Sequence, residues 1–331
     1  MEKQPFRISA LMSIFLFQED KEILLRRPKF YMPALLFLAA VLLDAAGCSA
    51  QTVPDFNGKQ AFRYLVKQCD FGPRNPGSAG HKKAQAYFVK EFSKFTDRVR
   101  LQPFPFVNYK DNLRLTLHNV IASFGSQSDR ILLAAHWDTR PWADQDPNPK
   151  NRNTPILGAD DGASGVAVLL EIARNLKENP PPVGVDLILW DGEDSGREGH
   201  ATEYLQGSRY FAQHKSPSYN PKFSILLDMV GDKELQLYEE GNSYRYAPDV
   251  VDLVWGIAGD LNFTQFIPEV KYTIVDDHLP LLEVGIPSID VIDFDYPYWH
   301  TLQDTPDKCS SESLRVVGQV LLNVIYGKTA P

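Results

Sequence analysis

Two neighbouring carboxylates follow an apolar segment near the middle of the chain. The run Trp190-Asp191-Gly192-Glu193-Asp194 comes directly after residues 185–190, which are typical of a buried strand. Consecutive residues that leave a strand can point in different directions. One carboxylate could therefore bind a metal ion while its neighbour stays free as a base. Two acids in a solvated loop would be the ordinary explanation, so the interpretation depends on the rest of the chain.

Other residues that bind metals also follow predicted strands or open a predicted helix. They are His136, Asp161, Asp228 and His300. In open α/β sheets the functional site lies outside the carboxyl ends of the strands, so these side chains are expected to converge. A mixed set of histidine and carboxylate ligands suits zinc, and a catalytic zinc keeps one position open. The spacing therefore predicts a zinc site at one edge of a sheet.

The segments between these residues predict the fold. The continuous apolar run at residues 131–135 predicts a strand covered on both faces. The largely apolar run at residues 185–190 predicts a buried strand, and residues 223–228 and 286–292 predict two more strands. Residues 99–102 and 113–117 alternate apolar and polar and predict strands with one solvated face. Helical spacing predicts helices at residues 58–69, 79–95, 158–176, 250–261 and from 311 onward. We expect an α/β fold, a single-domain, open, mostly parallel mixed sheet covered by helices on both faces.

Composition excludes some partners. The 331 residues are 44% hydrophobic and 23% charged, and the formal net charge is -8. An acidic chain argues against nucleic acid or an anionic membrane surface as the partner.

Residues 1–47 resemble an export signal. Arg26, Arg27 and Lys29 precede an apolar core at residues 32–43, which is shorter than the roughly 20 residues of a membrane span. The run Ala45-Ala46-Gly47-Cys48 resembles a bacterial lipoprotein box with a lipid anchor at Cys48, although cleavage near Ala50 is the alternative. We expect residues 48–56 to be a short linker and residues 57–331 to be the catalytic domain of a periplasmic or cell-envelope protein.

Several motifs, in this order, resemble one family. They are Gly158-Ala-Asp-Asp-Gly-Ala-Ser-Gly165, Asp191-Gly-Glu-Asp194, Leu226-Leu-Asp-Met-Val-Gly231 and Trp299-His-Thr301. Together they resemble the zinc peptidase family M28, and within it the glutaminyl cyclases of bacteria. Supporting runs are Phe71-Gly-Pro-Arg74, His136-Trp-Asp-Thr-Arg-Pro-Trp-Ala-Asp144 and Asp276-Asp-His-Leu-Pro280. The resemblance extends from about residue 57 to the end of the chain.

The resemblance implies a role for each candidate residue. Asp161, Asp194 and His300 would hold one zinc ion, and Glu193 would be the general base and acid. Asp228 and Asp276 would form an acidic network with Glu193, and Trp299 would line the pocket for the glutamine side chain. Two residues depart from the family pattern. Asp194 stands where the family often has glutamate, and Tyr204 stands where the bacterial cyclases have a pocket tryptophan.

The implied reaction converts an N-terminal glutamine of a peptide or protein to pyroglutamate with release of ammonia. We expect a monomer with one zinc ion and no nucleic-acid partner. A di-zinc aminopeptidase is the alternative, in which His136 and Asp228 would bind a second metal ion together with Asp161 as the bridging ligand. A further alternative is a lipoprotein that binds a ligand without catalysing a reaction, which the intact Glu193 disfavours.

The two cysteines outside the signal are Cys69 and Cys309. Cysteines of an exported protein are expected to be oxidised. The resemblance places both segments near the active-site rim, so we predict that they form a disulfide.

Overall fold

Six strands form the central sheet of the protein, in the order β1-β2-β4-β3-β5-β8. Their bounds are β1 Val99–Val107, β2 Arg114–Phe124, β3 Arg130–His136, β4 Gly184–Trp190, β5 Ser224–Asp228 and β8 Ser288–Ile292. The last four run parallel to one another, whereas β1 and β2 are antiparallel to their neighbours. The structure, a computed structural model, describes residues 52–327. The predicted mixed, mostly parallel sheet is confirmed.

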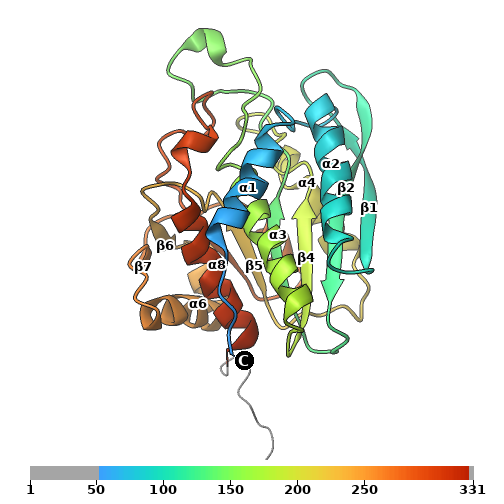
Figure 1. Ribbon diagram of the computed structural model, residues 1–331. Helices are drawn as coiled ribbons and strands as arrows, with labels where there is room; N and C mark the ends of the chain where they lie inside the picture. The colour runs from blue at the N-terminus through green and yellow to red at the C-terminus, as the bar shows by residue number, and fades with distance from the viewer. Residues whose placement is uncertain (1–51, 328–331) are drawn as a thin grey trace, which may run out of the picture. The chain divides into compact units, whose positions relative to one another are not determined.

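Helices cover both faces of the sheet, as predicted (Figure 1). One face packs on α1 Gly58–Cys69, α2 Ala79–Phe92, α3 Ala163–Glu178, α6 Pro248–Asp260 and α8 Ser311–Tyr326. The other face packs on α4 Gln206–His214 and α7 Leu279–Glu283. Strand β3 shows why both faces must be covered. Its residues Leu133 and Ala135 belong to the first core and Leu132 and Ala134 to the second, because side chains alternate across a strand.

The antiparallel edge is longer than the sequence predicts. Strand β1 continues through Pro103 and Pro105 to Val107, and β2 continues to Phe124. Proline cannot donate to a ladder, so it is tolerated on an edge strand such as β1. The second half of β2 is buried between β1 and β4 and loses the alternation on which the prediction relied.

Several short elements lack a sequence signal and were missed. They are the helices α4, α5 Gly241–Tyr246 and α7, the two-stranded sheet of β6 Leu237–Glu239 and β7 Phe266–Val270, and the 3-10 turns η1 Pro149–Asn151, η2 Ala201–Glu203 and η3 Pro306–Lys308. Elements this short span too few turns to show a period. The predicted helix at residues 79–95 ends instead at Phe92.

The predicted export segment at residues 1–47 and the lipid anchor at Cys48 lie outside the described residues. Within residues 52–327, no helix combines the length and the apolarity that crossing a membrane requires.

The predicted disulfide is wrong in this structure. Cys69, at the end of α1, and Cys309, just after η3, are both buried free thiols. Burial raises the pKa of Cys69 to about 12 and that of Cys309 well above its ordinary value. Both therefore remain protonated at neutral pH, in the form that reacts poorly.

We expect thiol reagents to leave the native protein unlabelled and to label Cys69 and Cys309 after denaturation without a reductant. The physical reason is that burial, and not a covalent bond, protects both sulfur atoms. Mass spectrometry of the alkylated protein measures this, with a reduced sample as the control. If neither residue were labelled in the unreduced, denatured sample, the two thiols would be paired after all.

Candidate active site

The candidate residues converge at the carboxyl ends of the parallel strands. His136 is the last residue of β3 and Asp228 the last of β5, while Glu193 and Asp194 follow the end of β4. Asp161 lies just before α3, and His300 lies in the long connection between β8 and α8. The parallel register aligns β3 with β4 and with β5, which brings these ends together.

Asp161, Asp194 and His300 form a cluster whose ligand atoms all lie within 4.8 Å of one another. The His300 Nε2 atom is 3.5 Å from Asp161 Oδ2 and 3.3 Å from Asp194 Oδ1. The Oδ2 atoms of Asp161 and Asp194 are buried and have no hydrogen-bond partner within residues 52–327. Buried carboxylate oxygens need a proton or a cation to offset desolvation. Two carboxylates and one imidazole fit a catalytic zinc, which takes three protein ligands.

A second cluster shares Asp161 with the first. It consists of His136, Asp161 and Asp228, again with ligand atoms within 4.8 Å of one another. The His136 Nε2 atom lies 3.0 Å from Asp228 Oδ1 and 3.2 Å from Asp161 Oδ1. Burial opposes protonation of this imidazole, yet the charge of Asp228 raises the pKa of His136 well above its ordinary value. Without metal, a protonated His136 therefore supplies the positive charge between these carboxylates.

Glu193 combines burial with access to a cavity. Its side chain is 13% exposed, and its Oε2 atom lies 3.7 Å from His136 Nδ1. Burial, and then the negative charge of Asp194, raise the pKa of Glu193 well above its ordinary value. Burial and the charge of Asp228 likewise raise the pKa of Asp276 to about 7. A carboxylate with a raised pKa is a better proton acceptor and donor near neutral pH.

A cavity of about 110 Å³ opens onto these groups. It is lined by Glu193 together with the proposed zinc-binding side chains, Asp228, Asp276, Tyr204 and Trp299. A neighbouring cavity of about 410 Å³ shares Tyr204, Trp299 and His300 with it. The Trp299 ring stacks on the His300 ring with centroids 3.9 Å apart. A substrate could thus place a small reacting group among the carboxylates while its remaining chain occupies the larger cavity.

The backbone is strained at three points of the site. Leu205, Met229 and His300 have φ values of 61°, 46° and 54°, in the left-handed region that side chains rarely occupy. Leu205 follows Tyr204, Met229 follows Asp228, and His300 is a candidate ligand. Such conformations persist where the surrounding structure enforces them, and they cluster at functional sites.

Asp138 is a site residue to which sequence reasoning gave no role. Its carboxylate accepts hydrogen bonds from the backbone N–H groups of Glu193, at 2.9 Å, and Asp194, at 3.3 Å, and from the Ser195 hydroxyl, at 3.2 Å. It therefore holds the turn that carries both acidic residues. The only sequence signal was its place in the run from His136 to Asp144.

Gly162 fixes the backbone beside Asp161. Its φ is 96°, and a Cβ atom there would lie 2.7 Å from the Asp138 carbonyl oxygen. Only glycine fits both the conformation and the space, so Gly162 lets the loop that carries Asp161 turn into α3.

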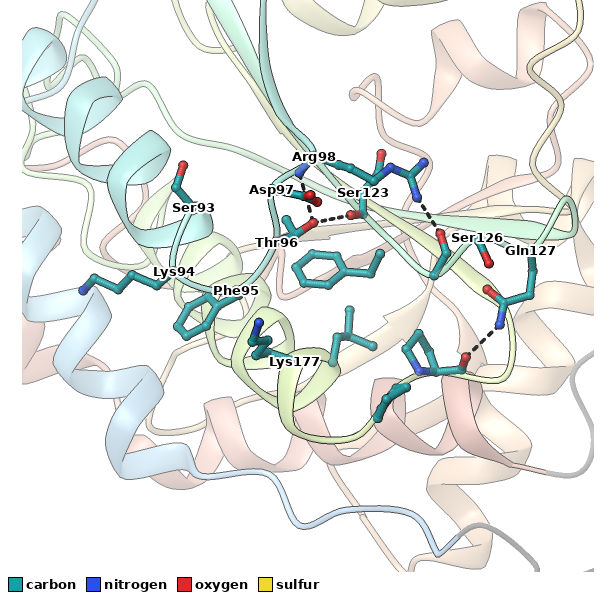
Figure 2. Close-up of a pocket in the computed structure, with 15 residues that line it drawn as sticks. Ser93, Lys94, Phe95, Thr96, Asp97, Arg98, Ser123, Ser126, Gln127 and Lys177 are labelled. Atoms are coloured by element: carbon teal, nitrogen blue, oxygen red, sulfur yellow. Dashed lines mark hydrogen bonds between the residues drawn. The ribbon is translucent and has the colours of Figure 1, made fainter.

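A larger cavity of about 670 Å³ lies at the opposite edge of the sheet, between the ends of α2, β2 and α3 (Figure 2). Among the described residues that line it, Asp97 is the one carboxylate and no histidine is present. Two of its three cations are engaged, since Lys94 pairs with Glu91 and Arg98 donates to the Gly125 carbonyl. Among the described residues, the groups that could hold a metal ion lie at the carboxyl edge and not at this cavity.

The fold and the donor set are those of a metal-dependent α/β enzyme, and comparison with known proteins agrees. Residues 119–325 match peptidase family M28. The chain therefore belongs to peptidase family M28.

Solved structures show which proteins the chain is similar to. The glutaminyl cyclase of Bacteroides thetaiotaomicron bound to N-acetylhistamine is 39% identical, with a TM-score of 0.81 over 84% of this chain and 100% of that one. A Zn-dependent exopeptidase from Parabacteroides distasonis gives the same identity, TM-score and coverage. The glutaminyl-peptide cyclotransferase of Bos taurus is 21% identical over 342 residues, 88% of this chain and 86% of its own.

Proposed function

We propose that the protein is a zinc-dependent glutaminyl-peptide cyclotransferase that converts N-terminal glutamine to pyroglutamate. The observation that carries the proposal is the cavity of about 110 Å³, in which Glu193 and Trp299 lie beside one complete set of zinc ligands. The 39% identity to a bacterial glutaminyl cyclase supports the same reaction.

Cyclisation joins the α-amine of the glutamine to its own γ-amide carbon and breaks the bond from that carbon to the amide nitrogen. Asp161, Asp194 and His300 would hold the zinc, which when bound polarises the γ-carbonyl as a Lewis acid. Glu193 takes a proton from the attacking α-amine and returns it to the leaving nitrogen, which departs as ammonia. This proton transfer is worth about 10²–10⁴-fold in rate.

The neighbours of Glu193 support this role. Asp276 and the adjacent carboxylates raise its proton affinity through like charge. Trp299 and Tyr204 form the walls of the cavity, and packing against the glutamine side chain would hold the reacting atoms close together. Because water is not a reactant, one metal ion is sufficient.

Mass spectrometry of a Gln-initiated peptide incubated with the protein tests the proposal. Loss of ammonia with retention of all residues is the expected result. Loss of the whole first residue would instead identify an aminopeptidase, and an unchanged peptide would refute both.

A di-zinc aminopeptidase is the second candidate function. The observation that favours it is the intact cluster of His136, Asp161 and Asp228 beside the first. One zinc per chain together with activity on glutaminyl peptides supports the cyclase, while two zinc ions together with activity on leucine amide support the aminopeptidase.

The cellular location of the enzyme is also part of the proposal. An export signal at residues 1–47, followed by a lipid anchor at Cys48, would place the protein in the periplasm or cell envelope as a monomer. Metabolic labelling with a palmitate analogue, compared between the wild type and Cys48→Ala, tests the anchor.

A further inference from the structure

A buried guanidinium connects two of the proposed zinc ligands. Arg140 lies in the loop after β3, and its side chain is 2% exposed. Its Nη1 atom donates to Asp194 Oδ1 at 3.0 Å and to the Gly196 carbonyl at 3.1 Å. Its Nε atom donates to both carboxylate oxygens of Asp144, at 2.9 and 3.0 Å. Planar, forked contacts of this kind fix orientation more strictly than a single ion pair does.

Asp144 continues the connection to the third ligand. Its Oδ1 atom lies 3.3 Å from His300 Nδ1. An imidazole that donates from Nδ1 has its lone pair on Nε2, and Nε2 is the His300 atom that faces Asp161 and Asp194. The carboxylate thus selects the tautomer and the ring rotation that a metal ion needs.

Arg140 also selects the free oxygen of Asp194. It occupies Oδ1, while Oδ2 of the same carboxylate is buried without a partner within residues 52–327. The remaining amino group, Nη2, donates to the Tyr204 hydroxyl at 3.1 Å. One guanidinium therefore contacts a metal ligand, the carboxylate that orients another ligand, and a wall of the substrate cavity.

We propose that Arg140 and Asp144 form a positioning pair that holds Asp194 and His300 in the geometry for zinc binding. The proposal rests on the zinc ligands assigned under the proposed function. The proposal gives a physical role to two residues of the sequence run from His136 to Asp144. Neither residue lines the small cavity that holds Glu193, although both line the larger neighbouring cavity. Their effect on the metal would pass through their contacts with Asp194 and His300.

The test is the zinc dissociation constant of purified protein, measured by competition with a chromogenic chelator. Asp144→Ala removes the partner of His300 and one partner of Arg140, and loss of such a partner typically weakens metal binding 10–100-fold. Asp144→Asn keeps an oxygen acceptor for His300 but loses the charge that pairs with Arg140. Its zinc affinity should therefore lie measurably below that of the wild type and above that of Asp144→Ala.

A matched control lies at the opposite edge of the sheet. There Arg130 forms a buried, forked pair with Asp186, with contacts of 2.7 and 2.8 Å, and Asp186 also accepts from Ser123, which lines the distant cavity in Figure 2. Asp186→Asn breaks a similar ion pair far from the zinc ligands and should leave the zinc dissociation constant unchanged.

Wild-type affinity in Asp144→Ala would overturn the proposal, as would equal weakening in Asp144→Ala and Asp186→Asn. If circular dichroism shows that the alanine variant does not fold, Asp144→Asn decides, and unchanged zinc binding by that variant would overturn the proposal. A different outcome would refute the proposed function without affecting the positioning pair. A wild type that binds zinc in an Asp144-dependent way, yet releases no ammonia from a glutaminyl peptide, would refute the cyclase and retain the positioning pair.

Discussion

Glu193→Gln protein is expected to keep its zinc and lose nearly all turnover. Glutamine has the same shape as glutamate but cannot accept the proton from the attacking α-amine, so the rate should fall about 10²–10⁴-fold. The zinc should stay because the adjacent Asp194, and not Glu193, belongs to the ligand cluster. The measurements are ammonia release from a glutaminyl peptide and zinc content by atomic spectrometry.

A control for this variant is Glu178→Gln, the same chemical change at the far end of α3, where Glu178 pairs with Arg174. It should retain both zinc and turnover. If Glu193→Gln lost its zinc, the roles of the two neighbouring acids would be reversed, and Glu193 would be the ligand.

Zinc stoichiometry should distinguish the roles of the two histidines of the site. His300→Ala removes one of three proposed ligands and should lose most of the zinc and most of the activity. His136→Ala should retain the zinc and part of the activity, because in the cyclase His136 only neighbours the ion. Its Nε2 atom is engaged by the Asp228 carboxylate, 3.0 Å away.

His214→Ala provides the matched control, because His214 is exposed on α4, where it hydrogen-bonds to the Tyr210 carbonyl and stacks on the Tyr210 ring. It should bind zinc as the wild type does. A wild type with two zinc ions, reduced to one in His136→Ala, would refute the cyclase assignment and favour the di-zinc aminopeptidase.

The sequence by itself determined the sheet and the edge at which the site lies. Residues 131–135 are apolar throughout and residues 185–190 are apolar except for Asp186, because β3 and β4 are buried on both faces. Parallel strands then place the residues after their carboxyl ends at one edge. The grouping of His136, Asp161, Asp194, Asp228 and His300 followed from this local information.

Only the tertiary structure decided which contacts each of these side chains makes. The di-zinc alternative already gave Asp161 to two metal ions, but only the folded arrangement of loops far apart in the chain brings its carboxylate into both clusters. Arg140 and Asp144 show no periodicity, and their partners Asp194 and His300 lie tens to hundreds of residues away. The short helices α4 and α7 are likewise held by packing on the sheet. The state of Cys69 and Cys309 depends on three-dimensional placement. Local sequence encodes periodicity and burial, whereas pairing between distant groups exists only once the chain has folded.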